Sequence, residues 1–267
     1  MKAKNLRKYG KQPFSVAVVH GGPGAAGEMA PVARELSDRW AILEPLQTKL
    51  TVGEQVEELK TTLENNATLP VTLVGFSWGA WLSFIFAATY PEFVKKLILV
   101  GSGGYEEKYA SKTQKTRMKR LSAKQKLEIK SLEKDLAHPA GQDKNVIFAK
   151  LGALFTKVDT YNPIPRSLGK SGEVDCRVDI FQSVWKDVAQ LRDSGELLEL
   201  GKHISCPVVA IHGDYDPHPA EGVEKPLLRV LQKFRFILLT NCGHKPWIEK
   251  DARGRFFQIL KEELSLI

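Results

Sequence analysis

Four short motifs contain residue types that together could carry out acyl transfer, and each motif follows a short apolar stretch. In chain order they are HGGPG at 20–24, GFSWG at 75–79, HGDYD at 212–216 and CGH at 242–244. They offer a glycine loop, a serine hydroxyl, a carboxylate and an imidazole. An imidazole that is oriented by a carboxylate can activate a serine, so these residue types together predict covalent catalysis.

Ser77 is the predicted nucleophile. A serine hydroxyl reacts poorly at neutral pH unless a neighbouring base removes its proton. In Gly-x-Ser-x-Gly the serine occupies a strained turn between a strand and a helix, and the flanking glycines let other backbone segments approach closely. An apolar stretch at 71–74 precedes the motif and another at 80–86 follows it. This context is the one that such a turn requires.

His244 is the predicted base, because it lies in a loop directly after the last expected strand. Asp216 is favoured over Asp214 as the carboxylate that fixes the imidazole tautomer, and Asp214 is expected to brace the turn. His20 is expected to shape the glycine loop through hydrogen bonds. The other histidines are weaker candidates for the base: His138, His203, His212 and His218.

Two backbone N–H groups are predicted to stabilise the oxyanion of a tetrahedral intermediate. One belongs to Trp78, directly after the serine at a helix N-terminus, and the other belongs to Gly22 in the glycine loop. The segment 20–24 could instead be a plain tight turn or a phosphate loop. It lacks the Gly-x-Gly-x-x-Gly spacing and the Gly-Lys-Ser/Thr ending, which argues against nucleotide binding.

The three cysteines, Cys176, Cys206 and Cys242, cannot all pair with one another and do not form the close pairs of a zinc site. We expect reduced thiols, as in the cytoplasm. Cys242 could be a reactive thiol, but a buried spectator is the favoured interpretation. No His, Asp or Glu cluster has ligand spacing in the sequence, so neither a metal nor an organic cofactor is expected.

The alternation of apolar strand-length runs with helical stretches predicts an α/β fold whose central sheet is mostly parallel and flanked by helices. Expected strands lie at 15–19, 40–43, 71–74, 97–100, 208–211 and 234–239, and expected helices at 30–36, 52–63, 78–88, 225–231 and 252–264. Only fourteen residues precede the first of these strands, too few for an opening hairpin. A sheet of about six strands follows.

An inserted helical cap is predicted at 104–202, dividing the core into 1–103 and 203–267, because about a hundred residues separate two expected strands there. Apolar residues at helical spacing across 121–136 predict one amphipathic helix, and 178–191 is a second candidate. A proline-rich turn at 161–165 separates them. Phe181 and Trp185 could line a substrate pocket or form the seam on which the cap packs, and the seam is favoured.

The formal charge of the 267-residue chain is +8, and the segment 108–134 carries all of that excess: ten Lys or Arg against two Glu. This run could steer an anionic substrate, touch nucleic acid or a membrane surface, or be merely a solvated helix face. It lacks the interleaved aromatic residues of a base-stacking surface, so no nucleic-acid partner is predicted. No stretch is long enough for a membrane span, and no signal peptide is recognisable at the N-terminus. A cytoplasmic location is expected.

Taken together, HGGPG, GFSWG, HGDYD and CGH resemble the α/β-hydrolase superfamily with a helical cap, over nearly the whole chain. HGGPG and the Trp after the serine are similar to the proline iminopeptidase branch. The resemblance implies Ser77 as nucleophile, Asp216 as acid and His244 as base. The chain departs from that branch at 43–47, where LEPLQ stands near the position of the usual Asp-Gln-Arg-Gly stretch.

The favoured function is a serine hydrolase of a small ester, thioester or amide, working through an acyl-Ser77 intermediate. A carbon–carbon bond hydrolase or lyase on the same scaffold is one alternative, because fold does not fix reaction. A small-molecule binding protein that retains the three residues with little turnover is another. Neither the substrate nor the oligomeric state follows from the sequence.

Overall fold

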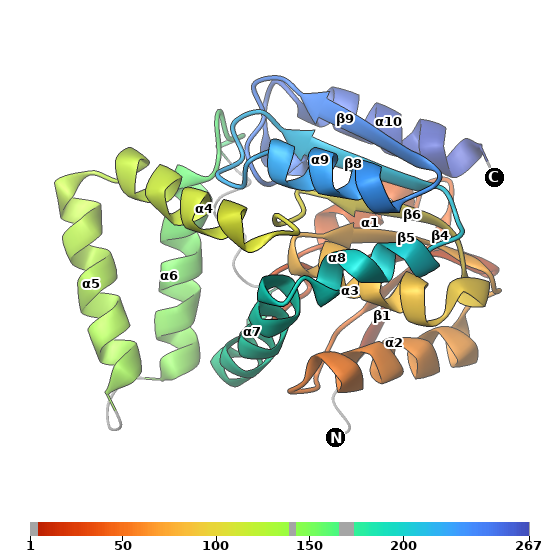
Figure 1. Ribbon diagram of the computed structural model, residues 1–267, viewed down its shortest axis with the longest axis horizontal. Coiled ribbons are helices and arrows are strands. Elements are labelled where there is room, and N and C mark those ends of the chain that lie inside the picture. The colour runs from red at the N-terminus through yellow and green to blue at the C-terminus, as the bar shows by residue number, and fades with distance from the viewer. Residues whose placement is uncertain (1–4, 139–142, 166–173, 267) are drawn as a thin grey trace.

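The computed structural model describes residues 5–138, 143–165 and 174–266, and its centre is a seven-stranded sheet (Figure 1). The strand order is β1-β4-β2-β5-β6-β8-β9, and every neighbouring pair is parallel except β1 with β4. The bounds are β1 Leu6–Tyr9, β2 Phe14–Val19, β4 Ala41–Pro45, β5 Val71–Phe76, β6 Val94–Val100, β8 Val208–Gly213 and β9 Phe234–Leu239. The mostly parallel α/β architecture predicted from the sequence is confirmed.

The expected count of about six strands misses one, because β1 also belongs to the sheet. β1 runs antiparallel to β4 at the edge. Its sequence, LRKY, carries two basic residues, and none of its four residues is buried. An edge strand of this kind lacks the apolar run that marks a central strand. A separate two-stranded sheet pairs β3 (Ala25–Ala26) with β7 (Asp175–Cys176).

The inner strands are largely buried on both faces, as parallel strands must be when helices cover them, whereas the edge strands β1 and β9 are partly exposed. In β5 all six residues are buried, and alternate side chains enter two hydrophobic clusters. One cluster packs against α2 (Val52–Asn66), α3 (Trp78–Thr89) and α9 (Glu221–Val230). The other packs against α1 (Ala30–Leu36) and α10 (Arg253–Ser265). The sheet therefore lies between two helical layers.

Five helices fill the predicted insertion at 104–202 as far as it is described. They are α4 (Glu107–Arg120), α5 (Ala123–Ala137), α6 (Lys144–Val158), α7 (Val178–Asp193) and α8 (Glu196–Glu199). Short 3-10 turns lie at η1 (Pro91–Phe93), η3 (Leu200–His203) and η4 (Pro246–Ile248). Figure 1 shows α5 and α6 side by side, projecting away from the sheet. A small core shared by α5, α6 and the end of α4 contains Leu121, Ile129, Leu151, Leu154 and Val158.

The single amphipathic helix expected across 121–136 is α5, but it begins later than expected. Leu121 instead ends α4 as its C-cap residue. Ser122 starts α5 with a capping box, in which its side chain accepts from the Gln125 N–H and the Gln125 side chain accepts from the Ser122 N–H. The second expected cap helix is α7, which begins at the predicted residue. Within the described ranges, no helix has the length and apolar character needed to cross a membrane.

Candidate active site

Ser77 lies on the sharp turn between β5 and α3 with φ 52° and ψ −114°. A positive φ at a residue other than glycine is uncommon and costs about 1 to 3 kcal/mol, which the surrounding structure must supply. The Ser77 N–H donates to the Val100 carbonyl at 2.9 Å, which ties the turn to the end of β6. The turn predicted from Gly-x-Ser-x-Gly is therefore present, and it presents Ser77 at the carboxyl end of the sheet.

Gly75 and Gly79 make this turn sterically possible. A Cβ on Gly75 would lie 2.2 Å from the Gly79 carbonyl oxygen, and one on Gly79 would lie 2.2 Å from the Val19 carbonyl oxygen. Both distances are far shorter than a van der Waals contact, and the obstructing atoms are backbone. The two glycines thus let α3 start directly against β2 and β5, which explains their spacing around Ser77.

The structure brings together the three residues that the sequence singled out from distant positions. His244 Nε2 lies 3.1 Å from Ser77 Oγ, and His244 Nδ1 lies 2.7 Å from Asp216 Oδ2. Asp216 follows β8, and His244 follows β9. In this arrangement the imidazole can accept the serine proton at Nε2 while the carboxylate holds Nδ1–H.

Asp216 is a buried carboxylate surrounded by three imidazoles. Burial alone would raise its pKa, but the electrostatic influence of the neighbouring imidazoles, above all His244, and the hydrogen bond from His218 outweigh burial and hold the pKa of Asp216 well below its usual value. Its side chain is fully shielded from solvent. Asp216 is therefore ionised at neutral pH and can stabilise an imidazolium at His244.

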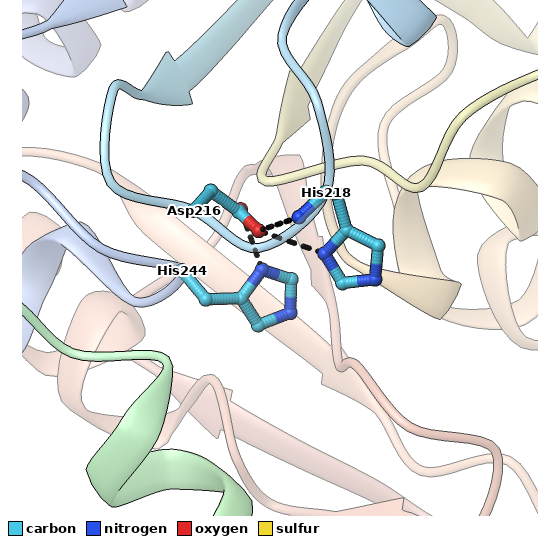
Figure 2. A group of neighbouring side chains, drawn as sticks. All are labelled: Asp216, His218 and His244. Carbon is cyan, nitrogen blue, oxygen red and sulfur yellow. Dashed lines mark hydrogen bonds and ion pairs between the residues drawn. The ribbon is translucent and has the colours of Figure 1, made fainter. Parts of the chain in front are cut away.

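His218 is the residue at this site that the sequence analysis underrated. Its backbone N–H and its ring Nδ1 both lie within hydrogen-bond distance of Asp216 Oδ1, at 2.9 and 2.7 Å. Figure 2 shows the rings of His218 and His244 side by side on the same carboxylate. Their ring centroids are 4.8 Å apart. The signal available in the sequence was the position of His218 two residues after Asp216. His212 in turn donates from Nε2 to the His218 carbonyl.

Asp214 and His20 have the bracing roles that the sequence predicted. The Asp214 carboxylate accepts from the N–H groups of Asn241 and Cys242, both at 3.1 Å, and so holds the loop that carries His244. His20 Nδ1 lies 2.9 Å from the Gly21 carbonyl, and its Nε2 accepts from the Gln47 N–H. Burial lowers the pKa of His20, which keeps it neutral for these two bonds.

The glycine loop turns tightly beside Ser77. Gly22 has φ 37°, and its carbonyl accepts from the Ala25 N–H at 2.8 Å. Gly24 has φ 81°, and a Cβ there would lie 2.1 Å from the Arg177 carbonyl oxygen. The Arg177 N–H donates to the Gly24 carbonyl where β7 pairs with β3. The insertion therefore contacts the glycine loop directly.

The loop that carries His244 is also bonded to the insertion. The His244 N–H donates to the Asp159 carbonyl at 2.8 Å, and the Asp159 carboxylate forms a two-pronged ion pair with Arg117 of α4. Glu249, which is fully buried, accepts from the N–H groups of Gly243, Tyr161 and Asn162 at 2.7 to 2.8 Å. The position of the imidazole thus depends on residues from both the core and the insertion.

Glu249→Gln is expected to lower the free energy of unfolding by about 2 kcal/mol, because the amide nitrogen cannot accept from the N–H groups that now face a carboxylate oxygen. Thermal denaturation of the variant measures this loss. Asp251→Asn is the matched control, since Asp251 is exposed on the same segment. Equal melting temperatures for Glu249→Gln and the control would contradict this role for Glu249.

Cys242 is a buried spectator in this structure rather than an exposed nucleophile. It is free of disulfide bonding and fully buried. Burial raises the pKa of the Cys242 thiol, and the nearby carboxylates of Glu249, Asp216 and Asp214 raise it further. The reactive thiolate is therefore disfavoured, as the sequence-based interpretation expected.

Asp216, His218 and His244 are also the kinds of residue that bind metal ions, and their ligand atoms lie within 4.8 Å of one another. Spacing in the sequence did not predict this cluster. Both imidazoles direct Nδ1 at the carboxylate at 2.7 Å, which is the distance of a charge-assisted hydrogen bond. A cation would have to replace both Nδ1 protons, so the geometry fits a hydrogen-bonded group better than a metal centre.

Phe181 and Trp185 form part of the contact between α7 and the core. The Trp185 ring stacks on Trp81 of α3 with centroids 6.0 Å apart, and on Phe181 at 5.9 Å. Trp81 is buried and donates from Nε1 to the Gly103 carbonyl. This stack agrees with the seam that the sequence analysis favoured. Trp185 nevertheless keeps 38% of its surface exposed.

The chain is similar to known proteins over most of its length. Residues 44–251 match the model of the alpha/beta hydrolase fold family. A proline iminopeptidase from Lactobacillus delbrueckii subsp. lactis is 24% identical over 255 residues, which cover 88% of this chain and 85% of the relative.

Two solved structures have the same fold at low sequence identity. VinJ superposes with a TM-score of 0.70 at 18% identity, covering 97% of this chain and 94% of VinJ. A thermophilic esterase from Thermogutta terrifontis superposes with a TM-score of 0.66 at 17% identity, covering 97% and 92%. The sheet order, the turn at Ser77 and the family match over residues 44–251 lead to one conclusion: the chain belongs to the alpha/beta hydrolase fold family.

Proposed function

We propose that this protein is a serine hydrolase that cleaves a small ester, thioester or amide through an acyl-Ser77 intermediate. The observation that carries the proposal is the hydrogen-bonded chain from Ser77 Oγ through His244 to Asp216, with distances of 3.1 and 2.7 Å. The strained turn adds support, because it holds Ser77 Oγ within 3.1 Å of His244 Nε2. Family membership supports hydrolase chemistry in general.

In the acylation step Ser77 Oγ attacks the carbonyl carbon of the substrate while His244 Nε2 takes its proton. The carbonyl oxygen becomes an oxyanion, for which we assign the backbone N–H groups of Trp78 and Gly22 as donors. Trp78 is the first residue of α3, so its N–H has no partner within the helix and the helix dipole favours negative charge there. The intermediate then collapses, and His244 gives its proton to the leaving alcohol, thiol or amine.

Deacylation repeats these steps with water. His244 removes a proton from the water as the oxygen attacks the acyl carbon, and Ser77 Oγ leaves with the proton that His244 returns. Asp216 keeps the Nδ1–H tautomer of His244 in both halves of the cycle and stabilises the imidazolium that forms in each. The products are the free acid and the original enzyme.

The substrate class is tested by steady-state turnover of three kinds of compound that represent an ester, a thioester and an amide. They are short-chain nitrophenyl esters, an aryl thioester and a proline anilide. The esterase and the iminopeptidase among the similar proteins motivate the choice. Turnover of any member that obeys saturation kinetics supports the proposal. Tight binding of these compounds by Ser77→Ala, with no turnover by the wild type, would favour a binding protein instead.

We expect the basic helices α4 and α5 to raise kcat/KM for anionic substrates. Exposed lysines on α4 and α5 include Lys115, Lys119, Lys124, Lys130 and Lys134. α4 is linked to the loop of His244 through the Arg117 to Asp159 ion pair. We expect kcat/KM for a dicarboxylate half-ester to fall several-fold between about 0.05 and 0.5 M salt, because such charges are screened.

A neutral ester of the same length is the control for this measurement, and its kcat/KM is expected to change little with salt. Parallel salt dependence for the two esters would contradict electrostatic steering. It would leave the basic helices as a solvated face.

A further inference from the structure

His218 contributes two of the three hydrogen bonds that the structure assigns to the Asp216 carboxylate. Oδ1 lies 2.9 Å from the His218 N–H and 2.7 Å from its Nδ1, whereas Oδ2 lies 2.7 Å from His244 Nδ1. The two oxygens are thus divided between two histidines (Figure 2). A Ser-His-Asp group needs only one imidazole on its carboxylate, so the second requires an explanation.

His218 is held in the neutral form that this arrangement needs. Burial lowers the pKa of His218, the charges of His244 and Arg117 lower it further, and Asp216 opposes them. A neutral imidazole has a single N–H, and the short contact with an ionised carboxylate places that proton on Nδ1. Its side chain is 15% exposed. His218 therefore acts on Asp216 as a donor.

Building on the function proposed above, we propose that His218 is a positioning residue that clamps Asp216 and sets how strongly its carboxylate holds the proton on His244. The clamp is geometric: two donors on Oδ1 stop the carboxylate from turning about its terminal bond, so Oδ2 stays on His244 Nδ1. It is also electrostatic, since donors on Oδ1 draw charge away from Oδ2. The imidazolium at His244 is then held less tightly and releases its proton more readily to the leaving group.

Other charged groups also surround His244, and they must be the same in every comparison. They come from the end of α6, from α4, from the turn after β9 and from the glycine-loop side, and His212 lies behind Asp216. These groups are Asp159, Arg117, Glu249, Lys245, Glu28 and His212. Substituting His218 alone leaves all of them in place, so a change in the pH profile can be attributed to the bond with Asp216.

The test compares His218→Ala, which removes the ring donor, with His218→Asn, whose side-chain amide can place an N–H near the position of Nδ1. His203→Ala is the control, because His203 lies on η3 between α8 and β8. Thermal denaturation establishes that each variant is folded. For each protein, kcat, KM and the pH profile of kcat/KM for an activated ester are measured from about pH 5 to 9.

We expect His218→Ala to lower kcat about ten-fold, the scale of one lost hydrogen bond to a charged group, with KM nearly unchanged. The acid limb of its kcat/KM profile should move to higher pH by about half a unit or more, because the full carboxylate charge then faces His244. His218→Asn should recover most of kcat. Wild-type kcat and pH profile in His218→Ala would overturn the proposal, as would a change confined to KM.

Proton NMR separates this proposal from the one on which it rests. The His244 Nδ1–H that faces Asp216 should give a resolved low-field signal in the wild type and in His218→Asn, and a broadened or displaced one in His218→Ala. An unchanged signal in His218→Ala overturns the clamp even if no ester is turned over. If the NMR signal differs among the three proteins as expected but the wild type shows no turnover and no acyl-enzyme, the hydrolase function is contradicted and the clamp is left intact.

Discussion

Ser77→Ala is expected to lower kcat for an activated ester by about 10⁵-fold, with KM within a few-fold of the wild type. The hydroxyl is the group that forms the acyl bond, and residues that act as a unit lose nearly their whole effect when one is removed. Substrate binding does not require the hydroxyl, so the value of KM should change little. Steady-state kinetics on protein purified free of contaminating esterase measures the change.

The matched control for this experiment is Cys242→Ser. Cys242 lies in the same region, and its thiol was the other candidate nucleophile, but it is buried and its pKa is raised by that burial. We expect Cys242→Ser to keep kcat within a few-fold of the wild type. Loss of turnover in Cys242→Ser together with full turnover in Ser77→Ala would reverse the assignment.

Asp216→Asn is expected to lower kcat by about 10³- to 10⁴-fold through the tautomer of His244. An amide has only one oxygen, and His218 already directs two donors at the position of Oδ1. The amide oxygen should remain there and turn the NH₂ group toward His244. Nδ1 of His244 must then accept, its proton moves to Nε2, and the lone pair that should receive the Ser77 proton is lost.

The kinetics of Asp216→Asn should be compared with those of Asp214→Asn. Asp214 lies two residues earlier and bonds to the backbone of residues 241 and 242, where an amide oxygen can replace one of its two acceptors. Asp214→Asn should therefore lose stability while keeping kcat within about ten-fold. If the two variants lose kcat to the same extent, a positional effect on the loop would explain the result better than the tautomer.

The central strands and the turn at Ser77 could be predicted because their signals are local. Parallel strands that are covered on both faces are continuous apolar runs, and 71–76 is one of them. Gly75 is required by a backbone contact with Gly79 in the same strand, turn and helix, and Gly79 is required by a contact with the end of β2. Because β5, β8 and β9 end at the same edge of the sheet, the structure brings Ser77, Asp216 and His244 together as the motifs suggested.

The edge strand β1, the helix α4 and the start of α5 were harder to predict. β1 has no apolar run, since it is half-exposed at the edge of the sheet. α4 is rich in lysine and buries only Tyr109, so it has no apolar stripe to reveal it. The break at Ser122 depends on a capping box of two side-chain bonds, and a periodicity of apolar residues continues through it.

Some features of the site depend on contacts between distant segments. Residues 159–162 of the insertion contact the His244 loop, and residues 175–177 contact the glycine loop. Both contacts join segments that are far apart in the sequence. Glu249 in particular joins three backbone N–H groups from two segments. Nothing in the sequence near Glu249 indicates such partners. Both loops of the candidate site are thus hydrogen-bonded to the insertion.

The most direct test of the account is the intact mass of the protein after incubation with a fluorophosphonate, which reacts with serine hydroxyls that a base has activated. We expect one adduct on the wild type and on Cys242→Ser, and none on Ser77→Ala. An adduct of equal yield on Ser77→Ala, or a wild type that gains no mass, would contradict an activated Ser77 and with it the proposed hydrolase.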